Sequence, residues 1–201
     1  RNCDIWWENE TEWHRNWKNN FPKEWQEIVH FDPLGEKHIA DIKTDKNWVI
    51  EFQHSFLTRV EQNSRNIFYG KLVWVVNGLR RKTDMTQFQK IINDSIQAPV
   101  KNINIRKINF PEESRLLREW LNCKVPVFFD FSHNNESPLW FLLPLNIDNE
   151  VYILSFSRSE FINVLKEDGF DELVFKLIPN IQKMILEYKR NVSNRSGNSP
   201  Y

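Results

Sequence analysis

Two carboxylates on one short hairpin constrain this chain more than any other feature. The runs IADIKT and WVIEFQ each alternate apolar and polar side chains, as half-buried strands do. The three residues between them, 45–47, suit a hairpin loop. Pairing Thr44 with Trp48 across that loop sets Asp41 directly opposite Glu51. A register shorter by one residue would send Asp41 into the core, so the hydrophobic pattern favours the first register.

Two facing acids repel each other unless a cation lies between them. Cross-strand partners have Cβ atoms roughly 4.5–5.5 Å apart, and like charges there are destabilising. A divalent cation would reverse that sign. We therefore expect that alanine at Asp41 or Glu51 raises stability in metal-free buffer. The alternative from the pattern alone is that Asp41 is a surface acid beside a turn and Glu51 an exposed strand residue.

Four blocks follow one another along the first half of the chain. They are EWHRNWK at 12–18, HIAD at 38–41, IEFQHS at 50–55, and then Arg65 with Tyr69. In this order they resemble the competence protein CoiA-like family of the PD-(D/E)XK nuclease superfamily. The order of the blocks is more specific than any single block.

The chain departs from that pattern in two places. Gln53 stands where the superfamily's name has lysine, a replacement that is also typical of the CoiA-like family. Many relatives carry a cysteine-rich, zinc-binding segment ahead of the nuclease core, and only Cys3 corresponds to it here. Because the chain begins at Arg1, we expect a trimmed chain or fragment in which that segment is missing.

The resemblance implies an α/β fold with a central mixed β-sheet flanked by helices. We expect the nuclease core in residues 1–100, an α+β extension in 101–190 that completes the sheet's flanks or forms a small lobe, and a flexible tail in 191–201. In the core, the pattern predicts a helix over 10–20, strands over 26–31 and through the hairpin, a helix capped by Ser55 or Thr58 and ending at Tyr69, and a buried strand over 71–77. In the extension it predicts helices over 83–96, 112–121, from Ser159 and over 173–188, and strands over 125–131, 139–145 and 151–156.

The resemblance also implies a metal-dependent deoxyribonuclease. Asp41 and Glu51 would hold Mg²⁺ or Mn²⁺ together with the carbonyl of Phe52 and solvent, since Mg²⁺ prefers hard oxygen ligands. Glu12 would be the third acid. Glu10, two residues earlier, points elsewhere on a helix, so only one of the two can serve.

Five further residues receive roles with structural alternatives. Gln53 would orient the attacking water or bind phosphate, and it cannot act as a general base. His14, Lys18, Arg65 and Tyr69 would contact the substrate. The structural alternatives are an outward strand residue for Gln53, a core residue for His14, and a salt bridge and a core tyrosine for Arg65 and Tyr69.

Composition limits how the chain meets DNA. Lys and Arg together number 27, as do Asp and Glu, so no global field attracts nucleic acid and any binding must be local. The run at 80–82 is basic but typical of a solvated loop.

Two distant cysteines fit a reducing cytosol, and we expect a cytoplasmic protein without a membrane span or signal peptide. Two other classes stay open, namely a DNA-binding accessory with weak or no cleavage, and a protein-interaction module built on aromatic residues such as Trp6, Trp7 and Trp13.

Overall fold

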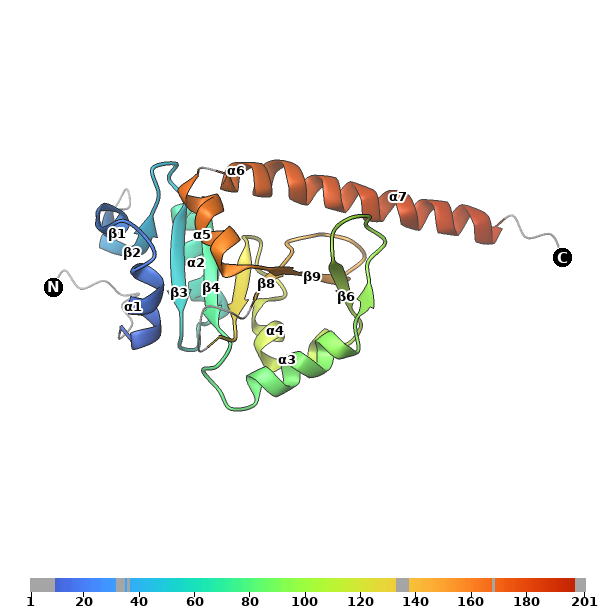
Figure 1. Cartoon of the computed structure of the whole chain (residues 1–201), viewed down its shortest axis with the longest axis horizontal. Helices are drawn as coiled ribbons and strands as arrows, with labels where there is room; N and C mark the ends of the chain where they lie inside the picture. Colours follow the sequence, from blue (N-terminus) through green and yellow to red (C-terminus); the bar gives the residue numbers. More distant parts are fainter. Residues whose placement is uncertain (1–9, 32–34, 36, 133–137, 168, 198–201) are drawn as a thin grey trace.

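The computed structural model describes residues 10–31, 35, 37–132, 138–167 and 169–197. Within these residues, nine strands form one mixed sheet in the order β1-β2-β3-β4-β7-β8-β9-β6-β5 (Figure 1). The strands are β1 (Gln26–Phe31), β2 (Lys37–Lys43), β3 (Val49–Gln53), β4 (Leu72–Asn77), β5 (Ile96–Gln97), β6 (Ile105–Ile108), β7 (Val127–Asp130), β8 (Leu139–Leu142) and β9 (Val151–Phe156).

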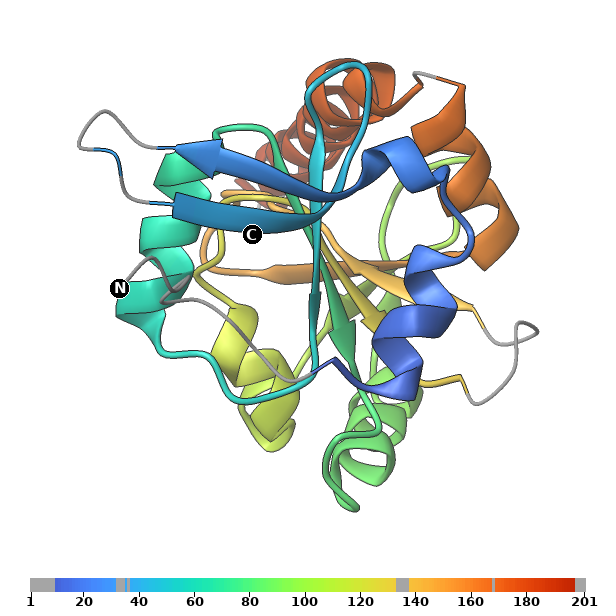
Figure 2. The ribbon, with the colours of Figure 1, turned by 90° about the vertical axis from the view of Figure 1, so that its left-hand side faces the viewer.

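Helices cover both faces of the sheet. They are α1 (Glu12–Lys18), α2 (Arg59–Tyr69), α3 (Asp84–Asn93), α4 (Arg115–Trp120), α5 (Arg158–Lys166), α6 (Phe170–Glu172) and α7 (Ile178–Gly197), with 3₁₀ turns η1 (Lys23–Trp25) and η2 (Pro111–Glu113) and a π-helical turn η3 (Leu173–Leu177). The core under α1, α5, α6 and α7 contains Trp17, Phe161, Phe170 and Ile185, and the core under α3 and α4 contains Phe88, Ile91 and Trp120. Figure 2 shows α1 and α2 on opposite sides of β3.

The predicted α/β class with a mixed, helix-flanked sheet is confirmed. Strands β3, β4 and β7 are parallel, and the other pairings are antiparallel. The helix α2 connects β3 to β4, as parallel neighbours require. Because β7 pairs with β4, the strands of the second half continue the sheet of the first.

The end of the chain differs from the sequence prediction. Residues 191–197 were expected to form a flexible tail, but α7 continues to Gly197. Ile181 and Ile185 bury one side of its first half, and a helix that has been nucleated extends at little further cost. Residues 191–197 therefore stay helical, and the side chains of 191–194 are exposed.

One buried aspartate joins three elements. Asp130, at the end of β7, is 0% exposed. Its Oδ2 accepts the indole N–H of Trp13 and of Trp17, both at 2.9 Å, and pairs with Arg158 of α5. Its Oδ1 accepts the backbone N–H of Ser132 at 3.0 Å. Burial of this charge is tolerated because two indoles, a guanidinium and a backbone N–H donate to the carboxylate.

We expect Asp130→Ala to lower the free energy of unfolding by about 3–5 kcal/mol, since it leaves the Arg158 guanidinium buried without its partner. Urea denaturation of the single variants and of Asp130→Ala/Arg158→Met measures this. The double variant should lose clearly less than the sum of the two single losses. Additive losses would show that the pair is not the source of the stability.

Candidate functional site

The hairpin adopts the predicted register. Lys43 pairs with Val49 and Ile42 with Ile50, and the loop closes through the Thr44 N–H, which donates to the carbonyl of Trp48 at 2.9 Å. Continuing this register by one residue leads to Asp41 and Glu51. The ladder, however, stops after Ile42, so the two acids are not joined by backbone pairing.

The Asp41 carboxylate takes the place of a backbone acceptor at this point. Its Oδ2 accepts the N–H of Phe52 at 2.9 Å. A buried backbone donor needs an acceptor, and here a side chain of β2 supplies it to β3. The carboxylate of Asp41 is thereby fixed against the residue that follows Glu51.

Three acids surround the ammonium of Lys18, which is contributed by the last turn of α1. Its Nζ lies 3.0 Å from Glu10, 3.2 Å from Glu27 and 3.3 Å from Asp41, and its side chain is 9% exposed. Burial alone would lower the pKa of Lys18, but the three carboxylates outweigh it and hold that pKa above its ordinary value. Burial likewise raises the pKa of Asp41, and Lys18 opposes this shift.

Glu27 reaches Lys18 through an unusual backbone conformation. Gln26 pairs with Ile42 and Ile28 with Ala40, so Glu27 lies opposite Asp41 in the β1–β2 register. Its φ of 55° falls in the left-handed region, which is costly for a residue with a side chain. A second acid thus lies beside Asp41 that the alternation of the sequence did not single out.

Glu51 has a separate cation. Its carboxylate is 8% exposed, and Arg65 Nη1 of α2 lies 3.2 Å from Glu51 Oε2, while Arg65 Nη2 lies 2.6 Å from Glu61. Lys18 and Arg65 therefore neutralise Asp41 and Glu51 from two different helices. Alanine at position 41 or 51 removes an ion pair, so we now expect a loss of stability where the sequence alone predicted a gain.

His14 holds the carbonyl of Phe52. Its Nδ1 accepts the backbone N–H of Thr11 at 3.1 Å, which places the ring proton on Nε2 in the neutral form. Nε2 lies 2.8 Å from the Phe52 carbonyl oxygen and donates to it. The structure thus brings His14 to the same backbone segment as Asp41, although the His14 side chain is buried.

Gln53 and Tyr69 lie in packed surroundings. Gln53 is 2% exposed, and its Nε2 donates to the carbonyl and hydroxyl of Ser55, both at 3.2 Å. Tyr69 packs on Phe68 and His30, with ring centroids 4.9 and 5.3 Å away. The ring contacts match the structural alternative for Tyr69. The hydrogen bonds of Gln53 stabilise the turn that follows β3.

Glu12, the predicted third acid, begins α1 with an exposed side chain, because the helix is capped by Thr11 and its first residue faces outward. Glu10, which precedes the helix, is the acid of this segment that contacts Lys18.

The basic run at 80–82 is also largely engaged. Arg80 pairs with Glu119 and donates to the carbonyl of Ser55. Arg81 lies 2.9 Å from Asp84 and 2.7 Å from Glu119. The interpretation as a solvated loop is wrong for these two arginines, because acids of α3 and α4 bind them.

Polar residues line the carboxyl ends of the parallel strands, and sequence reasoning missed two of them, Asn77 and Asp130. Asn77, at the end of β4, accepts the N–H of Leu79 through Oδ1 at 2.8 Å, so its Nδ2 is the atom 3.0 Å from His54 Nδ1. His54 follows β3 directly, and Asn77 pairs with Asp130 of β7. A polar residue at the end of each of three predicted strands was the available signal, since such edges often bind ligands.

The donor set around β3 suits a hard cation. Asp41, Glu51 and the Phe52 carbonyl are oxygen donors of the kind that Mg²⁺ and Mn²⁺ bind. Within the described residues, no group of three or more His, Cys, Asp and Glu side chains is arranged to hold a metal ion. A metal here would therefore need the carbonyl and water in addition to the two carboxylates.

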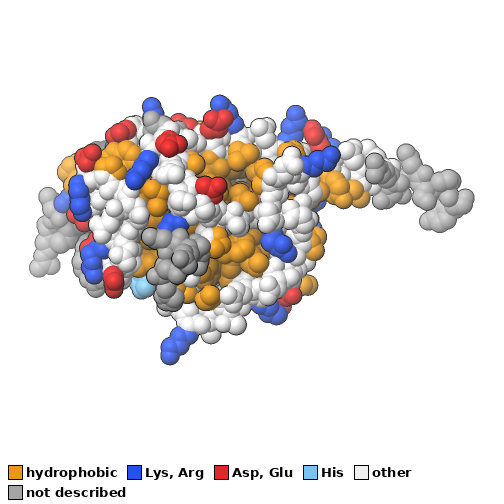
Figure 3. All heavy atoms as spheres, in the orientation of Figure 1, with side chains coloured by type: hydrophobic (Ala, Val, Ile, Leu, Met, Phe, Trp, Pro, Cys, Tyr) orange, Lys and Arg blue, Asp and Glu red, His pale blue; other side chains and the backbone are white. Residues whose placement is uncertain are grey.

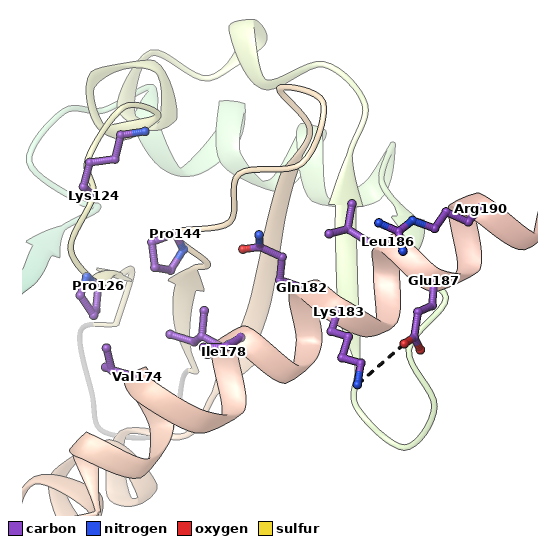
Figure 4. Close-up of a pocket in the computed structure, with 11 residues that line it drawn as sticks. Lys124, Pro126, Pro144, Val174, Ile178, Gln182, Lys183, Leu186, Glu187 and Arg190 are labelled. Atoms are coloured by element: carbon purple, nitrogen blue, oxygen red, sulfur yellow. Dashed lines mark ion pairs between the residues drawn. The ribbon is translucent and has the colours of Figure 1, made fainter.

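A pocket of about 480 Å³ lies away from these acids. It is bounded by α7, by the segment before β7 and by the segment after β8 (Figure 4). Gln182 points toward its interior, whereas Lys183 turns to Glu187, 3.9 Å away (Figure 4). The candidate site is thus separate from this pocket.

Comparisons with family models, with curated proteins and with solved structures find no match for this chain. Among the described helices, none has both the length and the apolar character needed to cross a bilayer.

We expect Lys18→Met to lower the free energy of unfolding by about 2 kcal/mol at pH 7, less than for a fully buried pair because its partners are partly exposed. The hydrogen bond from Lys18 holds the pKa of Glu10 below its ordinary value. Such a group stabilises the fold above its unfolded pKa, about 4.3 for Glu, and this contribution is lost as the pH falls through the folded pKa.

The difference between wild type and Lys18→Met should therefore stay nearly constant from pH 7 to about 4.3 and shrink below that, as the pH falls through the folded pKa of Glu10. Chemical denaturation across that range measures it, with Lys23→Met, an exposed lysine of η1, as the control. A difference that grows on acidification would contradict the assignment.

Proposed function

We propose that this protein is a metal-dependent DNA nuclease of PD-(D/E)XK type that acts in DNA uptake, recombination or defence against foreign DNA. One observation carries the proposal: the Asp41 carboxylate is hydrogen-bonded to the N–H of Phe52. This bond fixes one acid of β2 against Phe52, the residue that follows the second acid, Glu51. The connection β1-β2-β3-α2-β4, preceded by α1, supports the proposal, because it is the element order that the CoiA-like resemblance implies.

Asp41, Glu51 and the Phe52 carbonyl would hold Mg²⁺ or Mn²⁺. Such an ion activates a water and neutralises charge on phosphate oxygens. Around it, His14 orients the carbonyl through the hydrogen bond from Nε2. Lys18 and Arg65 fix the two carboxylates and balance their charge when no other cation is present.

Gln53 would act through the backbone. Its amide donates a hydrogen bond to Ser55. This bond would fix the conformation of the backbone that follows β3, next to Glu51. Gln53→Ala should then lower kcat more than DNA affinity, because it displaces the chemical groups without removing a phosphate contact. Equal losses in kcat and affinity would instead assign the amide to phosphate binding.

We expect cleavage of linear, circular or single-stranded DNA in Mn²⁺ and none in EDTA. Asp41→Asn and Glu51→Gln should each lower the rate by about two orders of magnitude or more, as the loss of a charge-stabilising group in an active site does. Both variants keep the size of the side chain, and circular dichroism checks that they fold. An Asp41→Asn protein that cuts DNA at the unmodified rate would remove the mechanism.

Two further variants decide which acid of the first segment contributes. Glu10→Gln should slow cleavage, because Glu10 contacts the lysine that holds Asp41. Glu12→Gln is the matched control on an exposed acid and should retain activity. The reverse result would restore Glu12 as the third acid.

The second candidate function is a DNA-binding accessory with little or no cleavage. The observation that favours it is that Asp41 and Glu51 each already have a buried cation, Lys18 or Arg65. Mn²⁺ titration followed by calorimetry separates the candidates. A nuclease should bind Mn²⁺ in a manner that depends on Asp41, whereas an accessory should not.

DNA binding should be weak and show a shallow salt dependence. Lys18, Arg65, Arg80 and Arg81 are held by acids, so few cations near the candidate site remain for phosphates, and we expect on the order of 2 to 4 contacts at a slope of about 0.9 each. A salt series with Glu51→Gln protein in EDTA measures the slope. Lys82→Ala, which removes an exposed lysine, should reduce it by about one, and a steep slope with tight binding would contradict this account.

A further inference from the structure

A second pocket opens beside α3, on the side of the sheet that Glu51 faces. It has a volume of about 310 Å³, at the lower end of the range for small-molecule sites. Three aromatic rings and two carboxamides are among the residues that line it, namely Phe88, Phe131, Trp140, Gln89 and Asn93. Hydrophobic side chains gather above α3 on the face that Figure 3 shows.

The aromatic wall is rigid at its base and accessible at one ring. Phe88 and Phe131 are 2% and 8% exposed, with ring centroids 4.5 Å apart. Phe131 also packs against the backbone of Gly78, where a Cβ would lie 2.5 Å from its ring. Trp140, 5.8 Å from Phe88, is only partly buried. A planar ligand can therefore stack on Trp140 without moving the wall.

The two carboxamides lie at the rim of the pocket. Gln89 and Asn93 are one helical turn apart on α3, and both are exposed. In the part of the chain that the structure describes, neither side chain makes a hydrogen bond. A carboxamide presents a donor and an acceptor side by side, which matches the edges of nucleobases.

The pocket lies within reach of the candidate site. In the register of the sheet, Glu51 pairs with Trp74 of β4, and Trp74 pairs with Val127 of β7. Phe131 is four residues farther along, about 13 Å at the usual rise, and two strand spacings add about 10 Å sideways. The separation of about 16 Å is one that a few nucleotides of single strand cover. Arg65, which binds Glu51, packs on Trp74, so Glu51 and the pocket share one face.

We propose that this pocket binds a nucleobase of a single-stranded nucleic acid whose backbone passes Asp41 and Glu51. The inference rests on the proposed function for the identity of the strand. Base–aromatic stacking supplies affinity to any base, which suits a candidate site whose nearby cations are held by acids. The carboxamides add hydrogen bonds to the edge of the base.

The test compares two DNA strands of equal charge. Fluorescence anisotropy measures the binding of Glu51→Gln protein, in EDTA, to a labelled oligonucleotide and to an abasic oligonucleotide of the same length. Because phosphates are identical, only the bases differ. We expect the intact strand to bind about 10-fold more tightly, the effect of stacking one base. Equal affinities would overturn the proposal, and they are also the outcome expected if the pocket instead contacts another protein.

Two substitutions test whether the preference for the intact strand over the abasic strand arises in this pocket. Trp140→Leu should abolish the preference for the intact strand, and Asn93→Ala, at an exposed position that does not threaten folding, should reduce it. Gln97→Ala, an exposed carboxamide on β5 at the far end of the sheet, is the control and should leave it unchanged. A preference that survives both pocket variants would place the base contact elsewhere and overturn the subsite.

The two proposals fail in different ways. Absence of cleavage in Mn²⁺ together with base-dependent binding in EDTA would reject the nuclease and keep the subsite. Cleavage together with equal binding of intact and abasic strands would keep the nuclease and reject the subsite.

Discussion

The buried pair of Asp130 and Arg158 is the interaction on which the arrangement of this protein depends. The carboxylate also binds the indoles of Trp13 and Trp17, so a helix at the start of the chain and one near its end are both fixed to β7. A buried charge is costly unless all of its lone pairs are used, and this requirement allows few alternative positions for α1. Since α1 carries His14 and Lys18, the placement of both depends on an aspartate that contacts neither.

The cations around β3 and at the start of α3 are directed at acids of this protein. Lys18, Arg65, Arg80 and Arg81 each bind at least one acid, and three of the four are themselves largely buried. A neutral composition does not reveal this, because equal numbers of acids and bases are compatible with dispersed surface charges as well as with internal pairs. Around β2 and β3 the pairing has a specific effect. It keeps Asp41 and Glu51 close to the same backbone segment without leaving their charges unopposed.

Alternation predicted β2 and β3, and a continuous apolar run predicted β4, because apolar side chains mark the buried positions of these strands. β1 occupies residues 26–31 as predicted, and α2 is capped by Thr58. The sequence missed β5 and β6, since β5 has two residues and neither strand shows a long alternating pattern. Secondary structure over 125–156 was anticipated, but its pairing with β4 was not, because the partner of a strand is set by packing across the whole sheet.

The sequence predicted the two acids of the candidate site, but it did not predict which side chains contact them. Register alone led to Asp41 and Glu51, as alternation fixes which side chains share a face. It did not lead to Glu27, which lies on the neighbouring strand β1 and has a left-handed backbone, or to the contact of Glu10 with Lys18. Asp130 was missed because nothing in its neighbourhood along the chain indicates that two tryptophans more than one hundred residues away will bind it.

The strand order has a consequence for how the chain folds as it is synthesised. β4 is complete by residue 77, but its free edge stays uncovered until β7 emerges some fifty residues later. β6 waits for about forty residues, because its partner β9 follows both β7 and β8 in the chain. Pairings between segments so far apart form slowly and leave strand edges open in the meantime. The first half of this protein thus emerges as a sheet with an apolar, unpaired border, and the late strands close it.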